Sequence, residues 1–228
     1  MVTGSYTGEV SPGGDADVRA LGCVTLTKVA VDRDMSNNCY VLHCAQTDEV
    51  VLIDAAAEPE RLLELIGDLV LTSVVTTHQH WDHHRALAAV KAAHPGATVV
   101  AGGPDADAIE EQTGVTVDRR VGEGDKVAVG TCDLVVIPLA GHTPGSIALL
   151  LDDPVVSPTP HLFTGDSLFP GGPGRTTDPG DFTSLMDDLE AKVFGRLADE
   201  TWFYPGHGND STLGAERGSV PQSRARGW

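Results

Sequence analysis

The sequence predicts an α/β protein in which two β-sheets pack face to face and helices cover their outer surfaces. The order of the segments carries this prediction: a run of strands, then helices alternating with strands, a second run of strands, and a final helix and strand. That order favours two packed sheets over one doubly wound parallel sheet. The chain has 228 residues, with no Gly/Ser linker in its middle and no tandem repeat, so one domain is expected.

The N-terminal part of the chain predicts an arm followed by strands. Residues 1–20 are rich in glycine and polar residues, which predicts a flexible arm, and residues 21–228 then form the single domain. Runs rich in Val, Leu and Ile, separated by turn residues, predict strands over 23–31, 39–44 and 50–54.

Helices alternate with strands in the next part of the chain. Leucines at helical spacing follow Pro59, a favoured residue in the first turn of a helix, and Gly67 ends the pattern. A later helix is stopped by the sequence His-Pro-Gly at 94–96. The elements predicted here are helix 58–66, strand 70–77, helix 82–93, strand 98–101 and helix 104–113.

The remainder of the chain predicts the second sheet. Residues 115–151 are mostly β in character, broken by Gly-Asp and Gly-His turns. Two short strands over 161–164 and 202–204 then enclose a helix over 182–197.

Composition limits the classes of partner. The chain has 15 basic and 33 acidic residues, a formal net charge of −18. Such a surface repels phosphate backbones and anionic lipids, so neither nucleic acid nor a membrane is an expected partner, and RNA processing is disfavoured. A small-molecule substrate is expected instead, and the sequence is compatible with a homo-oligomer.

Targeting and cysteine usage favour a cytoplasmic protein. The N-terminus has no basic segment followed by an apolar run, and the apolar runs are far too short to cross a bilayer. The four cysteines, Cys23, Cys39, Cys44 and Cys132, have no CxxC pair or dense spacing, so we expect reduced thiols.

Histidine and aspartate residues follow four of the predicted strands, at the point where each strand ends. Four of them come directly after SVVTT, and one each follows LVVIPLAG, HLFTG and TWFYPG. Because side chains on such loops sit on rigid supports, we expect them to converge on one site. The residues are His78, His80, Asp82, His83, His142, Asp166 and His207.

The spacing of these residues predicts two metal ions. His78 and His80 are two apart in an extended segment, so both imidazoles point to the same side, whereas Asp82 and His83 diverge toward a second centre. Asp166 has two oxygens that could bridge ions about 3.5–4 Å apart. Taken singly, Asp82 could be a helix N-cap, and His142 and Asp166 could be turn residues. Taken together, they favour a metal site, with Zn, Fe or Mn preferred over Ca or Mg.

The motifs THQHWDH, GHTPGS, TGDSLF and YPGHG, in this order, resemble those of the metallo-β-lactamase superfamily and of its glyoxalase II-like hydrolases in particular. The resemblance implies a four-layer αββα sandwich with the metals at one edge between two mixed sheets. It implies that His78, His80 and His142 hold the first ion, that Asp82, His83 and His207 hold the second, and that Asp166 bridges both. Asp54, which ends the strand VVLID, is implied as a partner of a ligand, with a helix or turn cap as its alternative role.

The loop PGGPGRTT also resembles a segment that lies beside the active site in this group, and Arg175 within it is a candidate contact for an anionic part of the substrate. A solvated loop charge or an ion pair is the alternative for Arg175. Glyoxalase II enzymes carry a C-terminal helical domain that helps hold glutathione, whereas only 21 residues follow His207 here (228 − 207). We therefore expect no such domain. His84 follows the ligand motif, and we expect it at a partly exposed helix N-terminus.

These observations predict a metal-dependent hydrolase that cleaves a small acyl thioester, with a thiol carrier other than glutathione, such as mycothiol. Two divalent ions, with zinc preferred, would lower the pKa of bound water from 15.7 to about 7 and so provide a hydroxide at neutral pH. Asp82 would orient this nucleophile, and a thiolate needs no strong general acid to leave.

Two other activities stay open at this point. His78, His142 and Asp166 form a 2-His-1-carboxylate set of the kind that mononuclear iron enzymes use, and a persulfide dioxygenase of this superfamily is the main alternative. A lactonase is less favoured, and so is a secreted β-lactamase, which would need an export signal. A purely structural metal site would be richer in cysteine.

Overall fold

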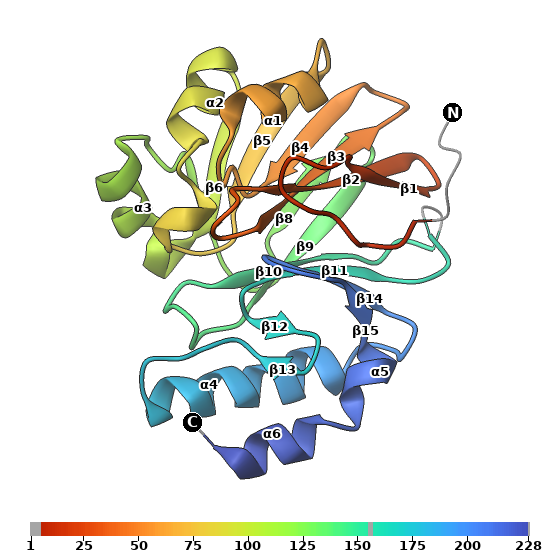
Figure 1. Cartoon of the computed structure of the whole chain (residues 1–228), viewed down its shortest axis with the longest axis vertical. Helices are drawn as coiled ribbons and strands as arrows, with labels where there is room; N and C mark the ends of the chain where they lie inside the picture. The colour runs from red at the N-terminus through yellow and green to blue at the C-terminus, as the bar shows by residue number, and fades with distance from the viewer. Residues whose placement is uncertain (1–5, 155–156, 228) are drawn as a thin grey trace.

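The computed structural model describes residues 6–154 and 157–227. These residues form four layers, with helices on the outside and two sheets packed together in the middle (Figure 1). The predicted αββα sandwich is therefore confirmed.

The strands of the first sheet lie side by side in chain order, from β1 to β7. Pairing is antiparallel from β1 to β4 and parallel from β4 to β7. The parallel strands need crossover connections, and helices supply them on the outer face. The strands are β1 (Asp17–Leu21), β2 (Val24–Val31), β3 (Asn37–Cys44), β4 (Glu49–Ile53), β5 (Val70–Thr76), β6 (Thr98–Gly102) and β7 (Arg119–Val121), and the helices are α1 (Pro59–Ile66), α2 (Leu87–Ala93) and α3 (Ala106–Thr113).

The second sheet has the order β15-β14-β11-β10-β9-β8, and only the β11–β14 pair is parallel among the described strands of this sheet. A two-stranded ribbon, β12 with β13, lies between this sheet and the C-terminal helices (Figure 1). The strands are β8 (Lys126–Val129), β9 (Cys132–Pro138), β10 (Ile147–Leu151), β11 (His161–Gly165), β12 (Leu168–Phe169), β13 (Gly172–Pro173), β14 (Trp202–Pro205) and β15 (Ser211–Thr212). The helices are α4 (Pro179–Asp188), which continues into a π-helical segment (Leu189–Phe194), α5 (Leu213–Arg217) and α6 (Val220–Arg226).

Apolar side chains fill each space between neighbouring layers. Leu26, Leu42 and Phe163 are fully buried between the two sheets. Leu62 and Ile109 belong to the cluster beneath α1 to α3, and the inner faces of α4 and α5 close the third cluster. Burial of apolar surface on both faces of both sheets is the main force that holds the layers together.

The histidine-rich segment differs from its prediction as a continuous helix over 82–93. A short 3-10 helix (Trp81–His83) comes first, and α2 begins only at Leu87. Asp82 is therefore not a helix N-cap, and its carboxylate instead accepts a hydrogen bond from the Asn37 amide. Buried polar side chains fix the turn at Trp81–His83, and a search for helical periodicity among apolar residues does not detect such contacts.

The arm predicted as flexible over residues 1–20 packs against the first sheet where the structure describes it, and β1 already begins at Asp17. The Lys28 ammonium, fully buried, donates hydrogen bonds to the Gly8 carbonyl at 2.7 Å and to Asp210 at 2.6 Å. The Tyr6 hydroxyl donates to the same aspartate. Residues 1–5 of the predicted arm lie outside the described residues.

The four cysteines are free thiols, as predicted. Across the described parts of the chain, no helix is both long enough and apolar enough to cross a bilayer.

Candidate metal centre

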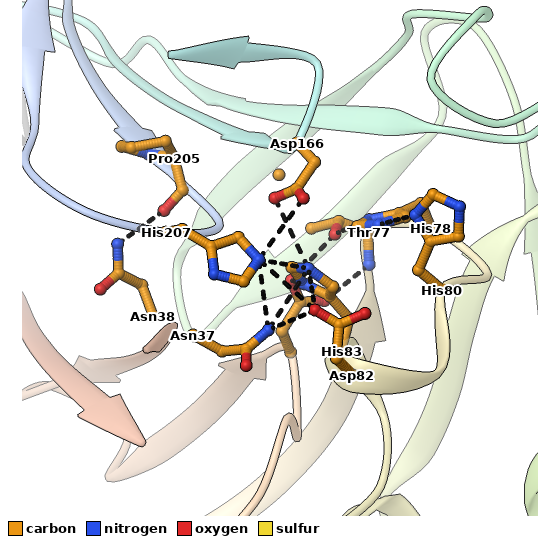
Figure 2. Close-up of polar contacts among 12 residues, drawn as sticks. Asn37, Asn38, Thr77, His78, His80, Asp82, His83, Asp166, Pro205 and His207 are labelled. Carbon is orange, nitrogen blue, oxygen red and sulfur yellow. Dashed lines mark hydrogen bonds and ion pairs between the residues drawn. The ribbon is translucent and has the colours of Figure 1, made fainter. Parts of the chain in front are cut away.

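The predicted polar residues meet where strands of both sheets end. β5 of the first sheet leads into His78, and the Thr77 carbonyl accepts a hydrogen bond from the Ile147 amide at the start of β10 in the second sheet. His142, Asp166 and His207 follow β9, β11 and β14 of the second sheet. Figure 2 shows Asp166, His207, Asp82 and His83 directed toward one centre, with His78 and His80 beside it.

The donor atoms form three overlapping groups, and within each group all atoms lie within 4.8 Å of one another. The groups are His78, His80 and His142; His78, His83 and Asp166; and Asp82, His83 and His207. The first and third groups are the two ligand sets that the resemblance implied. Asp166 lies between them, because its carboxylate oxygens are 3.7 Å from His142 Nε2 and 3.4 Å from His207 Nε2.

Backbone carbonyls orient two of the imidazoles. His142 Nδ1 donates to the Arg175 carbonyl at 2.6 Å, and His207 Nδ1 donates to the Met35 carbonyl at 2.9 Å. Each bond holds the proton on Nδ1, so the lone pair on Nε2 faces the cluster. Carbonyl and carboxylate partners behind metal-binding histidines act in this way and raise the basicity of the ligand.

Asp54 orients the other buried histidines. Its Oδ2 accepts from His83 Nδ1 at 2.9 Å and from Thr77 Oγ1, which in turn accepts from His78 Nδ1 at 3.0 Å. The Thr77 amide donates to its second oxygen. Asp54 itself has a φ of 58°, a backbone conformation that costs energy for a residue other than glycine. This backbone conformation directs the Asp54 carboxylate toward Thr77 and His83, on the side of His83 away from the cluster.

The cluster fits a cation. Two pairs of imidazole nitrogens face each other, His78 Nε2 with His80 Nδ1 at 3.1 Å and His83 Nε2 with His207 Nε2 at 3.2 Å. Lone pairs at such distances repel unless a proton or a metal ion lies between them. His142 Nε2 and Asp166 Oδ1 are buried without a hydrogen-bond partner among the described residues, which is costly unless a ligand satisfies them.

The electrostatics of the site favour positive charge. Burial disfavours the charged form of His83, but the carboxylates of Asp166 and Asp54 raise its pKa to about 10. Burial also disfavours the charged form of His207, but hydrogen bonds with Asp166 and Asp82 raise its pKa to about 9. The pKa of Asp166 lies well below its usual range despite burial, because His83 and His207 stabilise the carboxylate. The donor set therefore attracts cations and keeps its carboxylates ionised.

Sequence reasoning missed Asn37, a buried residue at the start of β3. Its Nδ2 donates to Asp82 Oδ2 at 2.9 Å and lies within 3.5 Å of the Nε2 atoms of His83 and His207. The Asn37 backbone forms an isolated β-bridge with His207. No sequence signal marks this asparagine, because its role depends on the meeting of two segments that are 170 residues apart.

Asp105 was missed as well, although a signal was present. It is fully buried and accepts hydrogen bonds from the Gln79 amide, the Thr143 hydroxyl and the Gly145 amide. It therefore ties the histidine motif to the loop that carries His142. Asp105 follows the end of β6, which is the same strand-end position that identified the other polar residues.

The expectation of a partly exposed His84 is wrong. The side chain is 2% exposed, and its Nε2 donates to the Gln79 carbonyl at 3.2 Å. His84 thus supports the histidine loop from behind.

Gly206 permits the cluster to close. A Cβ atom at this position would lie 2.1 Å from Asp166 Oδ1 and 2.7 Å from His83 Cε1, far inside van der Waals contact. The glycine in the motif YPGHG is thus required by the close approach of the ligands.

A cavity of about 250 Å³ opens beside the cluster and is lined by His80, His142, Arg175, Thr176 and Thr177. Arg175 is exposed, and its side chain has no hydrogen bond or ion pair with any other residue that the structure describes. A substrate bound next to the metal ligands would therefore meet a free guanidinium group.

Residues 32–207 match the metallo-β-lactamase superfamily. A hydroxyacylglutathione hydrolase of Polaromonas sp. is 35% identical over 170 residues, which cover 74% of this chain and 60% of the relative. The mitochondrial persulfide dioxygenase ETHE1 of Mus musculus is 32% identical over 172 residues, with coverage of 74% and 62%. The chain thus spans less than two thirds of the length of either relative.

A solved structure is also similar to this chain. The crystal structure of ETHE1 from Myxococcus xanthus superposes with a TM-score of 0.73 at 32% identity, and the match covers 88% of this chain and 84% of the other. The matched residues, 32–207, contain the strands from β3 to β14, the histidine motif and His207. The chain belongs to the metallo-β-lactamase superfamily.

Proposed function

We propose that this protein is a metal-dependent hydrolase that cleaves small acyl thioesters. The observation that supports this most is the arrangement of seven His and Asp side chains in two ligand sets joined by Asp166, next to an accessible cavity. Similarity to the hydroxyacylglutathione hydrolase of Polaromonas sp. points to the same chemistry.

The residues fit two divalent ions, with zinc preferred. His78, His80 and His142 would hold one ion, Asp82, His83 and His207 would hold the other, and Asp166 would be shared. When bound, such ions supply a water activated at neutral pH and a Lewis acid for the carbonyl oxygen. The chain fixes the ligands for this task, since Asp54 and two backbone carbonyls hold three of the imidazoles from behind.

Asp82 contributes more than ligation in this proposal. One of its oxygens accepts from Asn37, and this bond together with His207 and His83 keeps the pKa of Asp82 far below its usual range, against the effect of burial. The carboxylate therefore remains ionised and can accept a hydrogen bond from the attacking water. This bond would orient the water toward the substrate carbonyl.

The lack of a proton donor among the described side chains beside the metal ligands favours a thioester substrate over an amide. The cavity beside the cluster offers Arg175, Thr176 and Thr177, and none of these side chains is a good proton donor near neutral pH. A thiol has a pKa of about 8–9 and leaves as a thiolate without such a donor, whereas an amine does not.

The test begins with the metal content of protein purified without added metal. About two equivalents per chain and hydrolysis of an acyl thioester panel are expected, with activity reduced at least about 1,000-fold in Asp166→Ala, which removes the shared ligand. A panel hydrolysed equally by the wild type and by Asp166→Ala would refute the proposal.

A second candidate is a persulfide dioxygenase with a single iron. It is supported by similarity to two proteins named ETHE1, one of which is named as a persulfide dioxygenase. About one equivalent of iron, together with oxygen uptake on addition of a persulfide, would favour this activity. Zinc without oxygen uptake would exclude it.

A further inference from the structure

Two cysteines from different sheets meet at the end of the sandwich that lies away from the metal ligands. Cys23 stands in the turn between β1 and β2, and Cys132 begins β9 directly after the turn from β8. Their Sγ atoms are 3.3 Å apart, although the two residues are 109 positions apart in the sequence. A disulfide bond needs about 2.05 Å between the sulfur atoms, so each of them would have to move by about 0.6 Å.

The two hairpin turns are placed to make this small movement. β1 and β8 are edge strands of the two described sheets, so each hairpin includes a strand that is paired on one side only. The β8–β9 turn contains Gly130, whose φ is 59°. A Cβ atom at this position would collide with the Cys44 side chain, so the glycine allows the turn of the second sheet to approach the first sheet. The contact between the thiols follows from this approach.

The two thiols differ in their exposure. Cys132 is 3% exposed and belongs to the apolar cluster between the sheets, whereas Cys23 is half-buried and packs against the edge of that cluster. Burial and the contact with Cys23 raise the pKa of Cys132 to about 11, so Cys132 keeps its proton near neutral pH. An oxidant from solution therefore reaches Cys23 first, and Cys132 is already in contact to complete a bond.

The other two cysteines have different surroundings. Cys39 is buried in the cluster beneath α1 to α3, and burial raises its pKa to about 12. Cys44 is fully buried at the end of β3, with its Sγ 4.0 Å from the Thr131 hydroxyl. Burial disfavours the thiolate of Cys44, but backbone hydrogen bonds from Thr131 and Gln46 lower its pKa to about 7. Cys44 is therefore the competing thiol that a test must distinguish from the pair.

The pair is far from the metal centre. β2 runs from Val24, next to Cys23, to Val31, which is paired with Asn37 of the metal centre. At about 3.3 Å per residue, the eight steps from Cys23 to Val31 span about 25 Å. Chemistry at the pair therefore depends neither on the metal ions nor on the proposed function.

We propose that Cys23 and Cys132 form a reversible disulfide bond on reaction with a hydroperoxide. The Cys23 sulfur first attacks the O–O bond, which breaks; Cys23 becomes a sulfenic acid, and an alcohol leaves, or water in the case of hydrogen peroxide. The Cys132 sulfur then attacks the Cys23 sulfur, the S–O bond breaks, and the oxygen leaves as water with the Cys132 proton. The two thiols together lose two electrons to the hydroperoxide, and a dithiol returns them.

The bond would join the two sheets. It closes a loop from residue 23 to residue 132, and a crosslink over so long a loop strongly restricts the unfolded chain. We therefore expect the oxidised protein to unfold at a temperature about 5–15 °C above that of the reduced protein.

The test uses the full chain as purified, reduced, freed of reductant and treated with one equivalent of hydrogen peroxide. The remaining thiols are blocked with iodoacetamide in denaturant, and the protein is digested with trypsin. Peptide 20–28 contains Cys23, peptide 127–175 contains Cys132, and peptide 34–61 contains both Cys39 and Cys44. The variants are Cys23→Ser, which changes a half-buried turn residue, and Cys132→Ser, with Cys44→Ser as the matched control.

The expected result is a disulfide between peptides 20–28 and 127–175 in a chain that stays monomeric on a non-reducing gel, with peptide 34–61 alkylated twice. Both the crosslink and the rise in unfolding temperature should be absent from Cys23→Ser and Cys132→Ser, present in Cys44→Ser and reversed by dithiothreitol. The proposal is overturned if peptide 20–28 is recovered alkylated or over-oxidised without the crosslink. A bond from Cys23 to peptide 34–61, or to a second chain, would overturn it as well.

Discussion

Replacing Asp54 with asparagine changes the hydrogen bonding behind the metal ligands without a change of shape. The carboxylate accepts from the Thr77 amide on one oxygen, and from Thr77 Oγ1 and His83 Nδ1 on the other. An asparagine whose oxygen satisfies the Thr77 amide directs its NH₂ group at His83 Nδ1. His83 must then move its proton to Nε2, the atom that faces the second ligand set.

The size of the effect follows from this geometry. The His83–Asp54 bond is 2.9 Å long, both groups are buried, and such a charge-assisted bond contributes about 1.5–3 kcal/mol. Since loss of a partner behind a metal ligand costs about 10–100-fold in metal affinity, we expect a loss in this range. The loss should fall mainly on the ion held by Asp82, His83 and His207, because Asp54 contacts His83 directly and reaches His78 of the other ligand set only through Thr77.

The assay is competition with a chromophoric chelator, together with elemental analysis after dialysis. Asp54→Asn should retain about one ion per chain where the wild type retains about two, with the second site weakened about 10–100-fold. Asp118→Asn is the control, since this exposed carboxylate accepts from the Val99 amide and pairs with Lys91 away from the site. Equal affinity of wild type and Asp54→Asn for both ions would refute the role given to Asp54.

Three further predictions concern folding and assembly of the site. Gly206→Ala should lower the metal content in elemental analysis because its Cβ would lie 2.1 Å from Asp166, whereas Gly96→Ala, with open space around it, should not. Asp105→Ala leaves three donors unsatisfied and should lower the free energy of unfolding by at least about 2 kcal/mol in urea denaturation, with Asp125→Ala as an exposed control. Burial lowers the pKa of His161 to about 4; because the unfolded chain takes up this proton first, stability falls between pH 6.5 and 4, by up to about 3 kcal/mol. His161→Gln should remove that part of the loss in thermal denaturation, and equal losses in both proteins would contradict it.

Much of the fold and the membership of the site could be predicted because their signals are local. Strands such as β5 and β9 are rich in β-branched residues, and α1 shows helical spacing with Pro59 at its start. The ligand residues stand directly after such strands. The start of α2 was misplaced because the 3-10 turn at Trp81–His83 is fixed by long-range polar contacts and has no period of its own.

The supporting residues were harder to predict because their partners are distant in sequence. Asn37 acts through Asp82, 45 residues away in the sequence, and α6 is held by its contacts with β13 and by the ion pairs of Arg224 with Asp187 and Glu190. α6, with the sequence VPQSRAR, has no apolar stripe at helical spacing, although its proline stands in the first turn as in α1. Its position depends on the completed second sheet, which the sequence shows only in part.

The ligands that hold a metal also hold protons in its absence, and this competition has a measurable consequence. Neighbouring carboxylates raise the pKa values of His83 and His207 to about 10 and about 9, above the ordinary value of 6.5, so at pH 7 the metal-free protein keeps a proton between their facing Nε2 atoms, which are 3.2 Å apart. A metal ion must displace this proton, and we therefore expect uptake of the second ion to release about one proton per chain. Calorimetric titration of zinc in buffers of different ionisation enthalpy measures this release, and metal affinity should fall as the pH is lowered. His43→Gln, a change at a half-buried histidine remote from the ligands, should leave the number unchanged. Binding enthalpies independent of the buffer would show that the two imidazoles are neutral before metal enters, and that the carboxylates around them are balanced in some other way.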